Sequence, residues 1–479
     1  MKRGVLILAA IVPAILGLVV YLVGGFDPAL DDTPSWAKPV PFPDRIEDHS
    51  RGGSVRVAVL TPPEMIDQGS GGDTLRQLVL PSLFVAQPDG TWRASLVEPG
   101  TDRATKDGRS ASFRLRKDAR WSDGTPINAE DLRRTADSRF VASVDASSAD
   151  GTVTVRFVSK LPNWRHLWSG ERAISEPRPN VYGGAFLVRS TTSGLETVLT
   201  RNNSWYGGPA LPFLSSIHLV LAADPTMARQ LLGSGQVDAY DAPDDTVRTQ
   251  GISRLPGVSV ARKAGSGRSV GLRLDTGDLS QENRRRVAFG FPRKTFVNTL
   301  LHGEARALSG LSKEADGVWD SGADKEGTTL ASVQVTMVAP ADLPLSSLLL
   351  TSVERSVKEA QGSFVAMNAD TTGIEDIVSK MGADVVLDVH QDGPEVCWLC
   401  RFSGVDDDLA RLADSGDTGA QRTFSQKLRT EGRYLPLWRA DAVVGWRNAA
   451  VRCVAPNGYT AGSAWNAERW WSPQALVLR

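Results

Sequence analysis

The sequence predicts an α/β protein that stands outside a membrane, preceded by one N-terminal transmembrane helix. Three observations support this prediction. The 479 residues, 41% hydrophobic and 23% charged, are enough to bury two or three cores. The stretch from Phe113 to Thr135 alternates like a strand and continues like a capped helix. Residues 4–26 form an uncharged, mostly apolar run directly behind Lys2 and Arg3.

The apolar run, GVLILAAIVPAILGLVVYLVGGF, is long enough to cross a hydrocarbon core of roughly 30 Å at about 1.5 Å per residue. The basic residues before it favour the cytoplasmic side, so everything after Phe26 is expected outside. We therefore expect residues 1–26 to be an uncleaved, single-pass signal anchor in the cell membrane, with an extracytoplasmic globular part. A cleaved signal peptide is the competing interpretation, favoured by the short basic segment and by Gly24 and Gly25.

Residues 27–53 predict a linker between this anchor and the globular part. The segment has no apolar period, and acidic residues are interspersed with its prolines. These prolines are Pro28, Pro34, Pro39, Pro41 and Pro43. Prolines extend a chain, so the linker would hold the folded part away from the membrane.

The stretch FRLRKDARWSDGTPINAEDLRRT predicts a strand, a turn and a helix in that order. Phe113 and Leu115 alternate with arginines, which is typical of a half-buried strand, and Asp123-Gly124 supplies a turn. Asn128 is a good helix cap, and negative charge suits the first helical turn. The helix would carry Glu130, Asp131 and Leu132 at its start. A turn and a helix start account for these carboxylates, so the stretch predicts scaffold without catalysis.

One catalytic pattern occurs, Gly267-Arg268-Ser269-Val270-Gly271, which matches G-x-S-x-G. A nucleophile elbow needs a helix after the serine, whereas SVGLRLDT alternates like a strand. The five histidines are scattered, and no P-loop or four-ligand metal spacing is present. We therefore expect a protein that is not an enzyme, with no cofactor and no metal site. The formal net charge of -1 argues against nucleic-acid binding.

The three cysteines are Cys397, Cys400 and Cys453. In an extracytoplasmic protein they allow one disulfide and one free thiol. A redox pair is the alternative for CWLC. It would need a thioredoxin-like strand-to-helix setting, whereas Gly393-Pro394 indicates a loop.

Separate segments, in order, resemble the family 5 extracellular solute-binding proteins, the peptide- and nickel-binding class that serves ABC importers. The segment WSDGTPINAEDL is the most recognisable. Its companions are GGSVRVAV, LFVAQPDGTW, TVLTRNNSWYGGPALPFLSSIHLVLAADPTMARQLLGSGQVDAY and NRRRVAFGFPRKTFVNTLLHGEA. Together they are spread over residues 52–305.

The resemblance implies a bilobed, periplasmic-binding-protein-like clamp of class II, the large type with an extra inserted domain and mixed sheets. Lobe I would comprise residues 54–80, 180–262 and 440–479, and the inserted small domain residues 81–179. Lobe II, residues 263–439, would close on lobe I by hinge motion. The resemblance places Cys453 on lobe I and the other two cysteines on lobe II, and a bridge between the lobes would restrain this motion. It therefore implies the local Cys397–Cys400 disulfide with Cys453 reduced. The chain looks divergent and shortened, because the segment after Ala305 is short, Pro292 should break a family helix, and Asp392-Gly393-Pro394-Glu395 replaces the familiar D-Y-P-D-P loop.

The family's function implies a monomeric, membrane-tethered receptor that closes on a small solute, an oligopeptide or similar, and delivers it to an ABC permease. Asp392 aligns with the acidic residue that pairs with the α-ammonium group of bound peptides in family members. A turn cap beside Gly393 is the other interpretation of Asp392. Trp398 and Glu64 are expected to line the same cleft, and a core position is the other interpretation of Trp398.

The alternative function is a degenerate member that serves as a cell-envelope interaction or regulatory protein without transport. Actinobacterial lipoproteins of this fold that regulate envelope glycolipid synthesis show that such reuse exists in the wider family. An excess of arginine over lysine, with abundant alanine, glycine and aspartate, favours a GC-rich bacterial source. The shortened second lobe and the altered Asp392 loop favour the degenerate member that acts without transport.

Overall fold

Every residue that the structure describes lies within residues 51–450. The computed structural model describes residues 51–60, 75–86, 92–147, 151–162, 164–169, 173–207, 211–241, 249–263, 269–274, 276–300, 305–312, 315–320, 329–340, 346–369, 378, 380, 382–390, 398–402, 404–440, 442–448 and 450. None of the helices formed by these residues is both long and apolar enough to span a membrane. The predicted anchor, residues 1–26, lies outside them.

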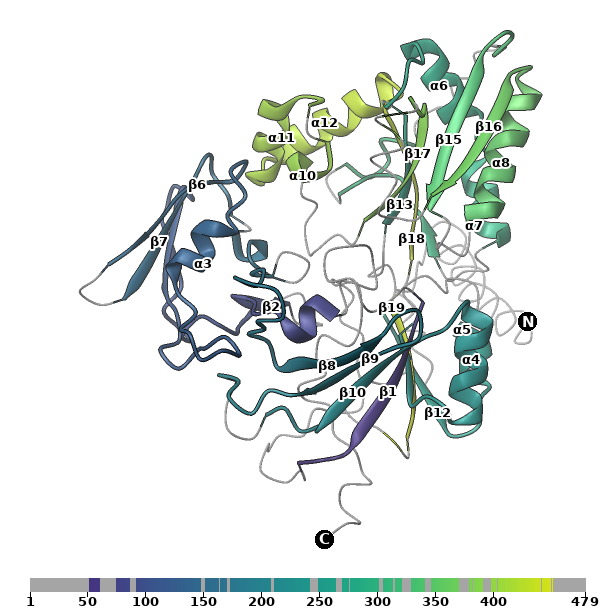
Figure 1. Ribbon diagram of the computed structural model, residues 1–479. Coiled ribbons are helices and arrows are strands. Elements are labelled where there is room, and N and C mark those ends of the chain that lie inside the picture. Colours follow the sequence, from purple (N-terminus) through teal and green to yellow (C-terminus); the bar gives the residue numbers. More distant parts are fainter. Residues whose placement is uncertain are drawn as a thin grey trace, which may run out of the picture. The chain divides into compact units, whose positions relative to one another are not determined.

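A seven-stranded mixed sheet, here the first sheet, draws its strands from three separate parts of the sequence (Figure 1). β1 is parallel to β10 and β11, whereas β19 is antiparallel to β11 and β12. In sheet order the strands are β12 Val258–Lys263, β19 Ala442–Arg447, β11 Ala239–Asp241, β1 Ser54–Val59, β10 Ser216–Leu221, β9 Glu196–Arg201 and β8 Phe186–Thr192. β19, the most C-terminal of the described strands, therefore lies between two strands from the middle of the chain.

A six-stranded mixed sheet, the second sheet, is built entirely from residues 269–440. β15 is parallel to β16 and β17, and β13 is antiparallel to both β17 and β18. In sheet order the strands are β14 Ala305–Ala307, β18 Tyr434–Ala440, β13 Ser269–Arg273, β17 Val385–His390, β15 Gln334–Pro340 and β16 Ser363–Ala369. Its central strands are rich in buried valine and leucine, as expected for strands covered on both faces.

Helices pack against both large sheets. α4 and α5 contact the first sheet, whereas α7, α8 and α12 contact the second (Figure 1). The helices of these regions are α4 Pro225–Ser234, α5 Thr249–Ser253, α6 Gln281–Gly290, α7 Arg293–Leu300, α8 Ser346–Glu359, α10 Trp398–Phe402, α11 Asp407–Asp414 and α12 Thr418–Thr430. The predicted break at Pro292 is confirmed, since α6 ends and α7 begins on either side of it.

Residues 84–166 form two small antiparallel sheets with short helices. The elements are β2 Phe84–Ala86, β3 Trp92–Ala94, β4 Arg103–Ala104, β5 Ser110–Arg114, β6 Val141–Ala146, β7 Thr152–Phe157, α3 Ala129–Arg134 and the 3-10 helix η3 Trp164–His166. The predicted strand, turn and capped helix are confirmed here. Phe113 is buried in β5, Gly124 turns with φ +86°, and Asn128 caps α3. Leu115 lies one residue beyond the strand and forms an isolated bridge with Val97.

Candidate functional site

Along the described strands, from β1 to β19, the chain crosses between the large sheets twice, and both connections leave the same edge of each sheet. In the first sheet β12 ends at Lys263, opposite Ala442, where β19 begins. In the second sheet β13 begins at Ser269, opposite Arg439 near the end of β18. The chain therefore passes between the sheets over residues 264–268 and again over residue 441. An edge here is the side of a sheet at which its strands begin or end. We call these two edges the joined edges.

The parallel strands of both sheets end at the joined edges. In the first sheet, Asp241 at the end of β11 lies opposite Val444 near the start of β19. In the second, His390 at the end of β17 lies opposite Ser269. The strands β1, β10, β15 and β16 run in the same sense as these two. Ligands of α/β sheets bind outside the carboxyl ends of the strands, so the joined edges form the candidate site.

Most of the predicted site residues follow these strand ends but lie outside the described residues. Glu64 belongs to residues 61–74, which follow β1, and Asp392 and Cys397 belong to residues 391–397, which follow β17. Cys453 lies in residues 451–479, also outside, and Cys400 lies in α10 with its side chain undescribed. The ligand contacts and the disulfide stay predictions.

Trp398 is described, and it packs as a core residue. It opens α10 with 1% of its surface exposed. Its ring lies 5.7 Å from that of Phe424 in an edge contact and 6.2 Å from that of Phe402. This packing accounts for the tryptophan without a ligand, and its predicted contact with one is untested.

Asp414 fixes the start of α10 from the end of α11. Its carboxylate accepts hydrogen bonds from the backbone N–H groups of Trp398 at 2.8 Å and Leu399 at 3.0 Å. The first N–H groups of a helix have no partner within it, and a carboxylate also suits the positive helix start. The residue that follows segment 391–397 is therefore held by a buried side chain.

Arg401, one turn further along α10, connects the helix to three strands of the second sheet. Its Nε and Nη2 donate to Asp388 Oδ2 in β17 at 3.2 and 3.1 Å. Its Nη1 donates to Ser269 Oγ in β13 at 3.2 Å, and Nη2 also donates to the Tyr434 hydroxyl in β18. The guanidinium carbon lies 5.0 Å from the Tyr434 ring centre, so the cation is also stacked. The arginine side chain is 2% exposed and the aspartate side chain 12%.

This network explains the serine of the G-x-S-x-G pattern. Ser269 is fully buried, and the strand predicted after it is confirmed as β13. Its hydroxyl accepts a hydrogen bond from Arg401. The sequence reasoning missed Arg401, Asp388 and Asp414. A signal for two of them was available, namely one aspartate in the apolar strand VVLDVH and one arginine in the apolar helix WLCRF.

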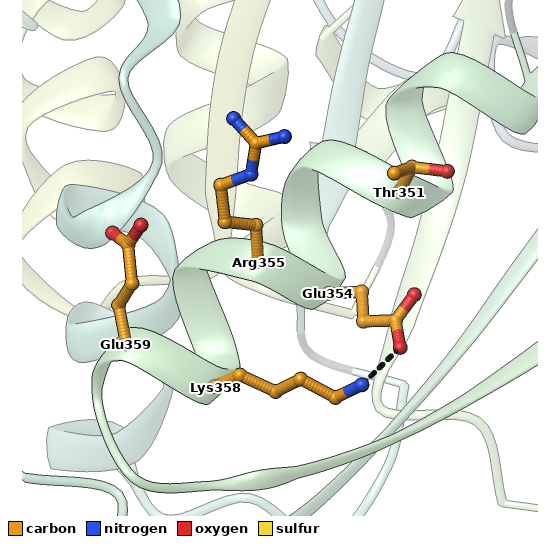
Figure 2. A pocket seen from close by; sticks show the side chains of 5 residues that line it. All are labelled: Thr351, Glu354, Arg355, Lys358 and Glu359. Carbon is orange, nitrogen blue, oxygen red and sulfur yellow. Dashed lines mark hydrogen bonds and ion pairs between the residues drawn. The ribbon is translucent and has the colours of Figure 1, made fainter.

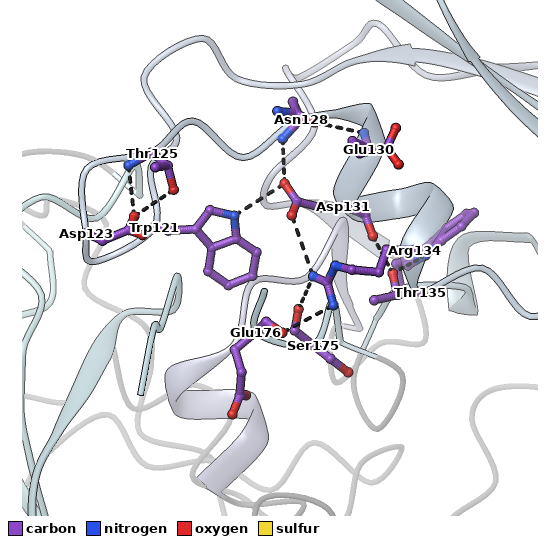
Figure 3. A network of polar contacts seen from close by, with 11 residues as sticks. Trp121, Asp123, Thr125, Asn128, Glu130, Asp131, Arg134, Thr135, Ser175 and Glu176 are labelled. Atoms are coloured by element: carbon purple, nitrogen blue, oxygen red, sulfur yellow. Dashed lines mark hydrogen bonds and ion pairs between the residues drawn. The ribbon is translucent and has the colours of Figure 1, made fainter. Parts of the chain in front are cut away.

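A second polar network surrounds the WSDGTPINAEDL motif (Figure 3). Asp131 accepts from the Asn128 N–H at 3.0 Å and from Trp121 Nε1 at 3.3 Å, and lies 3.5 Å from Arg134 Nη2. Arg134 in turn donates to the Ser175 carbonyl at 2.6 Å. These contacts tie α3 to a segment some forty residues later, so the motif is structural.

A depression of about 470 Å³ lies on the exposed face of α8 (Figure 2). It is lined by Thr351, Glu354, Arg355, Lys358 and Glu359, all from this one helix. Lys358 Nζ pairs with Glu354 at 2.6 Å, an ordinary pair of helix neighbours. Among the residues that the structure describes, no group of three or more His, Cys, Asp or Glu could hold a metal ion.

Comparisons with known proteins identify similar chains. Residues 101–332 match the model of the bacterial extracellular solute-binding proteins, family 5 Middle. The oligopeptide-binding protein OppA of Mycobacterium tuberculosis is 26% identical over 256 residues, which is 43% of this chain and 42% of that protein. The chain thus aligns with less than half the length of this curated relative.

Two solved structures cover far more of the chain. The oligopeptide-binding protein AppA from Bacillus subtilis, in complex with a nonapeptide, has a TM-score of 0.71 at 13% identity over 88% of this chain and 99% of that chain. NikA from Staphylococcus aureus, in complex with Ni(L-His)2, has a TM-score of 0.68 at 14% identity. This match covers 85% of this chain and 98% of that chain. These likenesses show the mixed α/β fold of periplasmic binding proteins.

Proposed function

Because the chain belongs to the bacterial extracellular solute-binding proteins of family 5, we propose that it is a membrane-tethered, extracytoplasmic receptor of an ABC import system. It acts as a monomer that closes two lobes on a small solute and delivers the solute to a permease. The proposed solute is an oligopeptide or a similar small molecule. The oligopeptide-binding relatives support this choice over the nickel complex of NikA.

The joined edges support a closing clamp most directly. Between β1 and β19, the two connections between the large sheets consist of residues 264–268 and residue 441 alone. Two short connections at one edge allow rotation about that edge, which is the geometry of hinge closure. The strand ends that precede Glu64 and Asp392 lie at these edges, so closure would bring both segments toward the same ligand.

We assign the ligand's α-ammonium group to Asp392. Asp388 is the described carboxylate residue that is nearest to Asp392 in sequence. It already accepts two hydrogen bonds from Arg401. A ligand cation therefore needs a different carboxylate, and Asp392 is four residues further along in the segment that follows β17. Removing one member of a buried charge pair costs about 2–5 kcal/mol, because the remaining charge is left without water or partner.

The dissociation constant of a bound peptide tests this assignment. Asp392→Ala in the full-length chain should weaken binding by roughly 30-fold to a few thousand-fold at about 1.4 kcal/mol per decade. Asp408→Ala is the matched control, since that side chain is 99% exposed. Thermal melts should be similar for all three proteins. Equal affinity of wild type and Asp392→Ala would show that the aspartate only caps its turn.

The alternative is a degenerate scaffold that acts in the cell envelope without transport. One observation favours it, since Trp398 is buried in an aromatic cluster and offers no exposed ring to a ligand. Wild-type protein that binds neither peptides nor nickel complexes would favour the scaffold. Normal uptake of labelled peptides by cells that lack the chain would favour it as well.

A further inference from the structure

The strand β16, Ser363–Ala369, is the outermost strand on one side of the second sheet among the described residues (Figure 1). Its seven residues, SFVAMNA, include no charged residue and no proline, and its parallel pairing with β15 runs from end to end without a bulge. Proteins usually protect an outermost strand with charges, prolines, bulges or a very short length, because its outward N–H and C=O groups can pair with another chain. β16 has none of these protections.

The other outermost strands of the two large sheets are protected. β8, at one side of the first sheet, has a bulge between Val188 and Ser190 and a charged residue, Arg189. β12, at the other side, has Arg262 and Lys263 as its last two residues. β14, at the far side of the second sheet, is only three residues long. β16 is thus the one long, regular and uncharged outermost strand of the large sheets, as far as the described residues form them.

Side chains on both faces of β16 are exposed. Val365 is 40% exposed, although valine is among the residues most often buried. Ser363, Ala366 and Asn368 are exposed as well, and within the strand only Ala369 is buried. Neighbouring residues of a strand point to opposite faces, so exposure of both Val365 and Ala366 leaves both faces of β16 open. A strand of another chain can therefore pair here without displacing core side chains.

The helix α8 lies beside β16 and would meet its counterpart in a second copy. It connects β15 to β16 and contacts both strands, so its axis lies over the space between them. In an antiparallel pairing of two β16 strands about a twofold axis perpendicular to the sheet, the two α8 axes lie about two strand spacings apart, or roughly 10 Å. Helices pack at about 8–10 Å between axes. One arrangement of two copies therefore allows strand pairing and helix packing together.

The side of α8 that faces beyond β16 carries both signs of charge. Val353 and Val357 are buried against the sheet. Parallel strand–helix–strand crossovers are right-handed in almost every case, so the residue that follows each of these valines points beyond β16. These residues are Glu354 and Lys358, which project from the same side of the helix and pair at 2.6 Å (Figure 2). A twofold axis reverses this row, so that an acid and a base of each copy face a row of opposite order.

We propose that two copies of this chain pair through β16, which joins their second sheets into one continuous sheet with the two α8 helices antiparallel on one face. The pairing surface runs along the side of the sheet, whereas the joined edges lie at the strand ends. Each copy therefore still acts as one receptor that closes on its own solute, and the pairing goes beyond the proposed function. One strand and one helix per copy form a small interface, which suits a reversible association.

Sedimentation of the full-length chain in detergent tests the pairing. Wild type should pass from monomer to dimer as the protein concentration rises. Val365→Lys with Ala366→Lys places a charge on each face of the strand and should raise the dimer dissociation constant about tenfold or more. The matched control is Val365→Thr with Ala366→Ser, which keeps the shapes without charge and should stay close to wild type. Both positions are exposed, so all three proteins should melt alike.

Hydrogen exchange of wild type at low and high protein concentration locates the interface without a substitution. Amides of residues 363–369 should exchange about tenfold more slowly in the dimer, whereas those of residues 186–192 in β8 should not change. A wild type that stays monomeric would leave β16 to a strand of a different protein and overturn the proposal. A dimer that the lysine variant leaves intact, or protection that appears only outside β16, would overturn it as well. Peptide affinity should be the same for the lysine variant and wild type, so the receptor function is measured separately.

Discussion

Asp238 and Asp384 hold the same position in two different sheets. Asp238 precedes β11, donates its N–H to the Arg56 carbonyl at 2.8 Å and accepts the Arg56 N–H on its carboxylate at 2.8 Å. Asp384 precedes β17 and exchanges the same two bonds with Thr336 at 2.8 and 2.9 Å. In both sheets the next residue enters a parallel pair with the partner strand. An aspartate thus stands at the start of the parallel β1–β11 pair in the first sheet and of the parallel β15–β17 pair in the second.

Asp384→Ala should destabilise the fold more than Asp384→Asn. The alanine leaves the Thr336 N–H without its acceptor, which costs about 1–3 kcal/mol where the group is buried. Asparagine keeps an acceptor oxygen in the same place, so its effect should be smaller. Urea denaturation at neutral pH measures both. Equal losses for the two variants would show that the hydrogen bond contributes nothing.

The stability difference between wild type and Asp384→Asn should depend on pH. Burial raises the pKa of Asp384 above its ordinary value of 3.8, and it does the same for Asp238. A carboxyl group with a raised pKa in the folded state stabilises the fold below the unfolded pKa, and this contribution is lost as pH rises through the folded value. Wild type should therefore lose stability relative to Asp384→Asn from acid pH towards neutral. A difference that is constant, or that grows in favour of wild type, would contradict this.

Gly271→Ala should disrupt the second sheet at the Arg401 network. A Cβ added at Gly271 would lie 2.0 Å from the Tyr434 hydroxyl oxygen and 2.3 Å from Cζ. Forcing extra atoms into a packed core costs about 1–3 kcal/mol, sometimes more. Gly290→Ala in α6 is the control, because a Cβ there meets nothing within 4 Å and alanine favours helix by up to about 1 kcal/mol. Comparable melting temperatures for the two variants would refute the close approach.

Asp131→Ala should destabilise the small sheets, whereas its neighbour Glu130 is dispensable. The alanine removes the acceptor of the Trp121 and Asn128 N–H groups, at a cost of about 1–3 kcal/mol. Glu130 is 72% exposed on its side chain and pairs only with Arg133 among the described contacts, so Glu130→Ala should stay within about 0.5 kcal/mol. Chemical denaturation of the two variants compares them, and an equal effect would mean that the network is not structural.

Local chemistry in the sequence predicted the elements whose ends depend on single residues. Asn128 caps α3 through bonds to residues two and three positions away, and Pro292 ends α6 because it has no N–H group. Such signals lie within one turn of the chain. Alternation alone predicts a strand through Leu115, whereas the ladder ends one residue earlier, at Arg114.

The Arg401 network could not be predicted in the same way, because its partners are distant in sequence. Ser269 is 132 residues from Arg401, and Tyr434 is 33. Only the folded second sheet brings them together. The candidate site was predicted through family resemblance, and the structure adds the strand ends from which the segments of Glu64 and Asp392 follow.

Titration calorimetry of the full-length chain in detergent, with a pool of di- to pentapeptides, tests the receptor function most directly. We predict saturable heat that fits one site per chain, with a negative heat-capacity change as the closing lobes bury apolar surface. A chain that melts cooperatively yet gives no saturable heat with any peptide in the pool would contradict the proposed peptide receptor.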